Sequence, residues 1–155
     1  HQGTGGCVIF PPTLKTQMNT IQSINNWFQQ AIPEPTDANR AMQIGCHFEE
    51  VGEMCDALGE GKGSDDINRL SDHWKQLAGV EPTEVNRKEL LGALCDQIET
   101  AIGVAHMFGM DIAGGLAEVD RSNWSKFVDG KPVFKPNGKI GKGPEYTEPN
   151  LESFL

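Results

Sequence analysis

Apolar side chains recur at spacings of three and four residues along most of this chain, and prolines and glycines interrupt the pattern. Such spacing places the apolar residues on one face of an α-helix, and the interruptions mark where each helix ends. The pattern predicts five helices, over residues 14–32, 37–58, 64–77, 84–108 and 112–124. The fold class is therefore predicted to be all-α, with the second and fourth helices as the central antiparallel pair of a bundle.

Residues with good capping side chains precede the first four segments. They are Thr13, Thr36 or Asp37, Ser64 and Thr83, and their side-chain oxygens can accept a hydrogen bond from the first helical turn. In the fourth segment the predicted core stripe is Leu91, Leu94, Ile98, Ile102 and Ala105.

Beyond residue 127 the composition changes. The turn dipeptides Asp129-Gly130 and Asn137-Gly138 flank short apolar stretches, which predicts a β-hairpin-like arm. Residues 7–127 are thus expected to form one all-α domain, with residues 128–155 as its C-terminal arm. Residues 1–6 lack a Met and are interpreted as an expression remnant.

The charge balance is acidic, with 22 Asp and Glu against 13 Lys and Arg and a net charge of -9. An acidic chain repels a phosphate backbone, so nucleic-acid binding is not expected. The apolar runs are far shorter than the ~18 residues that span a bilayer. The four cysteines form no C-x-x-C pair, and those in the predicted helices are expected to be free and buried. We therefore expect a soluble cytoplasmic protein with neither a membrane nor a nucleic-acid partner.

The second half of the second helix is rich in acids. From residue 41 to residue 60 it contains no Lys or Arg and five acidic residues, Glu49, Glu50, Glu53, Asp56 and Glu60. Like charges at i,i+3 and i,i+4 destabilise a helix unless something compensates them. A divalent cation held by several carboxylate oxygens would do so, and hard oxygen ligands favour Mg²⁺ or Mn²⁺.

A second acidic stripe lies on the fourth helix, opposite its apolar face, and consists of Glu89, Asp96 and Glu99. If the two helices face each other, their carboxylates can share a metal ion. The alternative is that both stripes face water and never meet.

The acidic motif also carries a family resemblance. Residues 49–53 read E-E-x-x-E, and Asp96 follows in a long apolar helix that ends before Gly109-Met110-Asp111. Over residues 14–127 this combination resembles the MazG-like all-α nucleoside triphosphate pyrophosphohydrolases. The stretch from Ser122 to Pro144 looks like the phage-encoded type, with the dGTP-directed MazZ branch as one candidate.

The resemblance implies a four-helix bundle, assembled as a homodimer or homotetramer, with Mg²⁺ or Mn²⁺ between E-E-x-x-E and a downstream E-x-x-D. It implies metal-dependent hydrolysis of a nucleoside triphosphate to the monophosphate and pyrophosphate, with dGTP or GTP as the favoured substrate. In a phage-encoded protein this reaction would adjust the nucleotide pool of the host cytoplasm. Carried over to this chain, the metal ligands are Glu49, Glu50, Glu53 and Asp96, with Glu50 and Glu53 as the catalytic carboxylates. Ala93 stands where the E-x-x-D glutamate is expected, so Glu89 or Glu99 is the substitute.

The segment from Arg121 to Lys142 is basic, with six Lys or Arg and one acid. By itself such a segment is typical of a solvated tail, but beside a carboxylate site it could cover a triphosphate or reach a neighbouring subunit. The candidate substrate contacts are Asn123, Lys126 and Arg121. The tryptophans at helical spacing are interpreted as core or interface residues. The alternative function is a non-catalytic acidic helical module that binds a protein partner.

Overall fold

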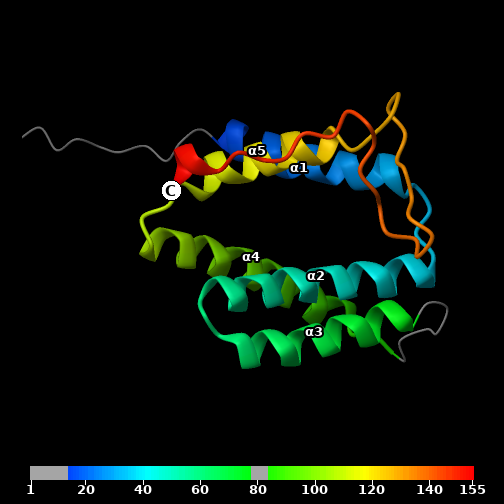
Figure 1. Cartoon of the computed structure of the whole chain (residues 1–155), viewed down its shortest axis with the longest axis horizontal. Coiled ribbons are helices and arrows are strands. Elements are labelled where there is room, and N and C mark those ends of the chain that lie inside the picture. Colours follow the sequence, from blue (N-terminus) through cyan, green and yellow to red (C-terminus); the bar gives the residue numbers. More distant parts are fainter. Residues whose placement is uncertain (1–13, 78–83) are drawn as a thin grey trace, which may run out of the picture.

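The computed structural model describes residues 14–77 and 84–155, and that part of the chain contains five α-helices (Figure 1). They are α1 (Leu14–Ala31), α2 (Asp37–Ala57), α3 (Gly61–Gln76), α4 (Arg87–Met107) and α5 (Ile112–Trp124), and a short 3-10 helix, η1 (Glu152–Phe154), follows near the C-terminus. The described residues outside the helices form no strand, only two isolated antiparallel bridges, Val128 with Lys131 and Phe134 with Ile140. The all-α class is confirmed, and the hairpin-like pairing in the described arm is limited to these two bridges.

The start of α2 follows the predicted capping chemistry. The Thr36 hydroxyl accepts a hydrogen bond from the backbone N–H of Asn39, and the Asn39 side chain accepts one from the backbone N–H of Thr36. This reciprocal pair satisfies two N–H groups that a helix end otherwise leaves without partners. The cap predicted at Thr36 is confirmed.

The predicted start of α3 is wrong. Gly59 ends α2 with a φ of +78°, and α3 begins immediately afterwards at Gly61. Ser64 is buried inside α3, where its hydroxyl accepts a hydrogen bond from the Asn68 side chain. α4 is capped by Asn86, and the caps predicted at Thr13 and Thr83 lie outside the described residues.

The principal partner of α2 is α3, which corrects the expectation that α2 pairs with α4. Gly45 and Gly52 of α2 are buried against α3, and the buried Ser71 donates a hydrogen bond of 2.7 Å to the carbonyl oxygen of Gly45. Small residues on both helices let the two backbones approach closely. Among the described side chains, α4 reaches α2 through a hydrogen bond between His47 and Gln97, with no close backbone contact.

A second layer is formed by α1 and α5, which lie side by side above α2 and α3 in Figure 1. Its core is a cluster of Trp27, Ala31 and Phe127, in which the Trp27 and Phe127 rings stack with centroids 5.3 Å apart. Trp27 Nε1 donates a hydrogen bond to the Asn123 carbonyl oxygen, and the Ser23 hydroxyl donates one to the buried Asp120 carboxylate. The face of α1 that carries Trp27 is therefore a packing surface, as the sequence predicted.

Most of the predicted core stripe of α4 is exposed in this chain. Ala105 is buried, whereas Leu91 and Ile98 are 64% and 59% exposed. Cys95 on the same helix is exposed too, and Cys46 and Cys55 are half-buried; all three are free thiols.

None of the described helices is by itself long and apolar enough to cross a bilayer, but α4 and α5, bent by 119° at their junction, meet that criterion together.

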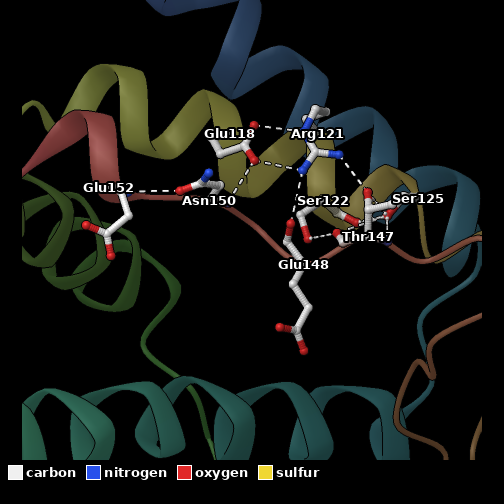
Figure 2. A network of polar contacts seen from close by, with 8 residues as sticks. All are labelled: Glu118, Arg121, Ser122, Ser125, Thr147, Glu148, Asn150 and Glu152. Atoms are coloured by element: carbon white, nitrogen blue, oxygen red, sulfur yellow. Dashed lines mark hydrogen bonds and ion pairs between the residues drawn. The ribbon is translucent and has the colours of Figure 1, made fainter.

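The last part of the arm, residues 143–155, returns along α5 and is called the strap below (Figure 1). Hydrogen bonds fasten it to α5 (Figure 2): Arg121 donates to the Thr147 hydroxyl and the Glu148 carbonyl, and Glu118 accepts from the backbone N–H of Asn150. At its end, the Phe154 carbonyl accepts a hydrogen bond from the backbone N–H of Asp111. The strap thereby fixes the path of residues 128–142, the first part of the arm.

Candidate functional site

Glu49, near the middle of α2, is contacted by two lysines from other parts of the fold. Lys75 of α3 and Lys139 of the arm each donate a hydrogen bond of 2.8 Å to Oε2 of Glu49. The hydrogen bond from Lys139, and then that from Lys75, hold the pKa of Glu49 below its usual value. The missing counter-charges of α2 are therefore supplied by residues 26 and 90 positions away in the sequence.

Glu50, the next residue, has the opposite electrostatic setting. Partial burial raises its pKa, repulsion from Glu53 and Glu49 adds to the rise, and attraction to Lys139 and Lys126 opposes it. A carboxyl group with a raised pKa can take up and release a proton closer to neutral pH than an ordinary glutamate. Between Glu49 and Glu50, Glu50 is therefore the carboxyl group whose surroundings favour uptake of a proton.

Lys126 follows α5 and faces the same site from the arm side. Its ammonium group is half-buried, and this burial lowers its pKa. Lys139 differs, because its hydrogen bond to Glu49 raises its pKa and keeps it charged. The thiol of Cys46 also lies here, and burial raises its pKa, which makes it a poor nucleophile.

A cavity of about 140 Å³ lies between these side chains. Its walls come from α1, α2 and the arm, and include Trp27, Phe28, Met42, Glu50, Lys126 and Lys139. The cavity can take a small group, such as a phosphate.

A much larger open groove of about 1230 Å³ adjoins it between the end of α1, the start of α2 and the start of α4. The groove shares Phe28, Ile32, Asn39 and Gln43 with the smaller cavity. Its floor is apolar, and Arg40, Arg87 and Lys88 lie along its lining. None of the motif glutamates lines it.

The acids of α4 do not join those of α2 in this chain. Glu89, Asp96 and Glu99 are exposed, and their helix makes no close backbone contact with α2. Within residues 14–77 and 84–155, no three His, Cys, Asp or Glu side chains form a group that could hold a metal ion. The oxygen donors of α2 suit Mg²⁺ chemically, but the chain alone does not assemble the two-helix ligand set.

The three predicted substrate contacts have different positions. Lys126 lines the small cavity. Asn123 is on α5, where its backbone carbonyl accepts the Trp27 hydrogen bond. Arg121 makes a two-pronged ion pair with Glu118, which lowers the pKa of that carboxyl to about 2, and it also holds the strap (Figure 2). Lys126 is therefore the one of the three that the structure brings to the motif glutamates.

Sequence reasoning missed Lys75, which lies outside the basic arm and has no spacing relation to the E-E-x-x-E motif. Lys139 belonged to the basic segment, but nothing in its local sequence set it apart from the other lysines there.

Comparison of the chain with family models, with curated proteins and with solved structures found no match. Function is therefore inferred from the residues of this chain and their contacts.

Proposed function

We propose that this protein is a metal-dependent hydrolase that converts a nucleoside triphosphate into the monophosphate and pyrophosphate. The observation that carries the proposal is the meeting of Glu50 with Lys126 and Lys139 at one cavity, where Lys139 also donates a hydrogen bond to Glu49. Carboxylates bind divalent cations and lysines bind phosphate oxygens, so both partners of a metal–triphosphate complex have ligands there. A guanine nucleotide, dGTP or GTP, is the first candidate because of the resemblance to the MazG-like family.

In the proposed reaction, water attacks a phosphorus atom and the bond to the pyrophosphate leaving group breaks. Glu50 takes the proton from that water, a role that its raised pKa favours. Lys126 and Lys139 bind the phosphate oxygens, and Asn123 and Arg121 stay predictions as outer substrate contacts. Glu49 and Glu53 would hold Mg²⁺ or Mn²⁺, which neutralises charge on the phosphates when bound. Asp96, with Glu89 or Glu99, is proposed to complete the ligand set in the assembled four-helix bundle.

The decisive assay is incubation of the full chain with each of the eight common NTPs and dNTPs, in Mg²⁺, in Mn²⁺ and in EDTA. Pyrophosphate and orthophosphate are measured separately. The proposal predicts metal-dependent pyrophosphate release without orthophosphate. Orthophosphate release would instead indicate an ordinary phosphatase, and no turnover with any nucleotide would favour the protein-binding module.

A matched pair of variants tests the role of Glu50. Loss of a general base lowers the rate by about 10²–10⁴-fold, so Glu50→Gln should lose at least 100-fold in pyrophosphate release. Glu145→Gln makes the same chemical change at an exposed glutamate of the strap and should stay within twofold of the unmodified protein. Equal activity of the two variants would refute the assignment of Glu50.

A further inference from the structure

Lys142 immediately precedes the strap, and an aromatic ring of the strap holds its ammonium group. Nζ of Lys142 lies 4.5 Å from the centre of the Tyr146 ring, a distance at which the electron-rich face of the ring attracts a cation. The ring itself carries no negative charge. Lys142 is therefore held in place while its charge stays available to an anion, unlike Lys75 and Lys139, which pair with a carboxylate.

The carboxylate that pairs with Lys142 is that of Glu148, and this pair is weak. Oε1 of Glu148 lies 4.0 Å from Nζ of Lys142, and the two side chains are 80% and 57% exposed. Water screens a pair that is this long and this exposed, so the pair stabilises the fold little. Figure 2 shows the Glu148 side chain extending away from Arg121, which donates to its backbone carbonyl. A phosphate group can therefore displace Glu148 from Lys142 at a small cost.

The backbone places Lys142 beside Lys126. The N–H of Gly143 donates a hydrogen bond of 3.0 Å to the carbonyl oxygen of Lys126. A Cβ at Gly143 would lie 2.7 Å from that oxygen, so a glycine is needed for this close approach of the two backbones. Burial lowers the pKa of Lys126, and repulsion from Lys142 and Lys139 lowers it further. Lys126, Lys139 and Lys142 thus form one group of positive charges, called the lysine cluster below.

The lysine cluster has more positive charge than the neighbouring acids balance. Lys139 shares its carboxylate, that of Glu49, with Lys75. Among the side chains that the structure describes, no carboxylate lies within ion-pair distance of Lys126. Like charges that a fold brings together repel one another, and an anion bound between them removes this repulsion. Because each phosphate group offers several oxygens to ammonium donors, the cluster fits a ligand with more than one phosphate.

The three lysines differ in their position relative to the cavity. Lys126 and Lys139 line it together with Glu50, whereas Lys142 lines neither the cavity nor the larger groove. The cavity takes a small group, such as one phosphate. A ligand with consecutive phosphates would therefore place one of them in the cavity and the next one outside it, beside Lys142.

We propose that Lys142 binds a phosphate group outside the cavity, in a polyphosphate chain that begins at Lys126, and that Tyr146 is its positioning residue. The proposed function gives this chain a direction. The phosphate that water attacks lies beside Glu50, so Lys142 contacts the pyrophosphate leaving group and offsets the negative charge that develops on it. The contact with the leaving group rests on the proposed function, whereas the binding of a polyphosphate does not.

Binding to the full chain in Mg²⁺ is measured with two probes, inorganic tripolyphosphate by calorimetry and inorganic phosphate by phosphorus NMR. Loss of one charged hydrogen-bond donor weakens binding about tenfold or more. Lys142→Gln should therefore bind tripolyphosphate about tenfold more weakly and bind phosphate unchanged, whereas Lys126→Gln should bind both probes more weakly. Lys131→Gln, at an exposed lysine of the same arm, is the control and should bind both probes within about twofold of the unmodified protein.

Two variants of Tyr146 test its positioning role. Tyr146→Phe keeps the aromatic face and should bind tripolyphosphate within about twofold of the unmodified protein. Tyr146→Leu removes that face and should lose as much affinity as Lys142→Gln. Equal losses in the two Tyr146 variants would overturn the positioning role.

Failure of this inference can be distinguished from failure of the proposed function. Tripolyphosphate binding that depends on Lys142, without turnover of any nucleotide, would support the phosphate site and refute the hydrolase. Nucleotide turnover with Lys142→Gln unchanged, both in tripolyphosphate affinity and in pyrophosphate release, would overturn the role of Lys142 alone. The absence of tripolyphosphate binding to the unmodified protein would also overturn it.

Discussion

Gly45 lies where α2 packs tightly against α3, and it permits a sharp prediction. A Cβ at this position would lie 2.5 Å from Cγ of Lys75 and 2.8 Å from the carbonyl oxygen of Ser71. The oxygen belongs to the backbone, so α3 itself must shift to make room. Overpacking of this kind destabilises a protein by about 1–3 kcal/mol, whereas Gly→Ala in a helix stabilises it by up to ~1 kcal/mol. We expect Gly45→Ala to lower the free energy of unfolding by roughly 1–2 kcal/mol.

Urea denaturation followed by circular dichroism measures this difference, with all variants at one protein concentration. Two other glycines of α2 and α3 provide a graded comparison. At Gly52 a Cβ would lie 2.6 Å from the Asn68 side chain, and this side chain can rotate away. Gly52→Ala should therefore lower the free energy of unfolding by less than Gly45→Ala. At Gly61 a Cβ would meet nothing within 4 Å, so Gly61→Ala should be at least as stable as the unmodified protein.

The result has a consequence for the site. Lys75 donates to Glu49 and also carries the Cγ atom that the new methyl group would displace. Gly45→Ala should therefore weaken the Lys75–Glu49 pair as well as the helix packing. If Gly45→Ala were as stable as Gly61→Ala, the close packing of α2 on α3 would be refuted.

Two further predictions concern the acid stability and the core of the α1–α5 layer. The lysine hydrogen bonds lower the pKa of Glu49 in the folded state, so the ionised group stabilises the fold fully above its usual pKa of 4.5. This contribution disappears as the pH falls through the lower pKa of the folded state. Glu49→Gln should therefore reduce the loss of unfolding free energy over that acidic range, and an unchanged pH profile would contradict the pairing. Phe127 is 7% exposed and stacks on Trp27. Phe127→Ala should therefore destabilise the protein by about 3–5 kcal/mol and shift tryptophan fluorescence to longer wavelength. Phe134 is 48% exposed, so Phe134→Ala should change neither stability nor fluorescence.

Apolar periodicity located the five helices because it reports which residues share one face, and the bounds predicted for α5 were confirmed. It could not choose the partner of each helix. That choice depends on small residues, Gly45 and Gly52 on α2 and Ser64 and Ser71 on α3, each pair seven positions apart. Small residues at this spacing on both helices let the two backbones approach closely. The sequence contains this spacing, but the pattern of apolar residues does not reveal it. Ser64 was mistaken for a helix cap because a good capping side chain is also a small one.

At the candidate site, the sequence located the glutamates but not their environment. A run of acids without local bases predicted a cation, because only counter-charges on the same helix can be recognised from spacing. In the fold, the counter-charge of Glu49 comes from α3 and from the arm, through contacts that span 26 and 90 residues. The opposite pKa shifts of Glu49 and Glu50 also follow from tertiary structure, because these neighbours differ only in which side of α2 they occupy.

The two lysines that contact Glu49 belong to elements that are held in place differently, and this difference bears on how a ligand would enter the site. Lys75 is on α3, which is packed along α2, whereas Lys139 is on the arm, which contacts the body through Ile140 at the Trp27 cluster and through a hydrogen bond from Gln30 to the Gly130 carbonyl. A partly exposed ion pair contributes only about 1 kcal/mol or less, so separating Lys139 from Glu49 is a small cost. A triphosphate with its cation would give each side chain a new partner: the phosphate oxygens would bind Lys139, and the metal would bind Glu49. In the proposed function, the arm is therefore the element that exchanges partners on binding, while α3 keeps the motif in place.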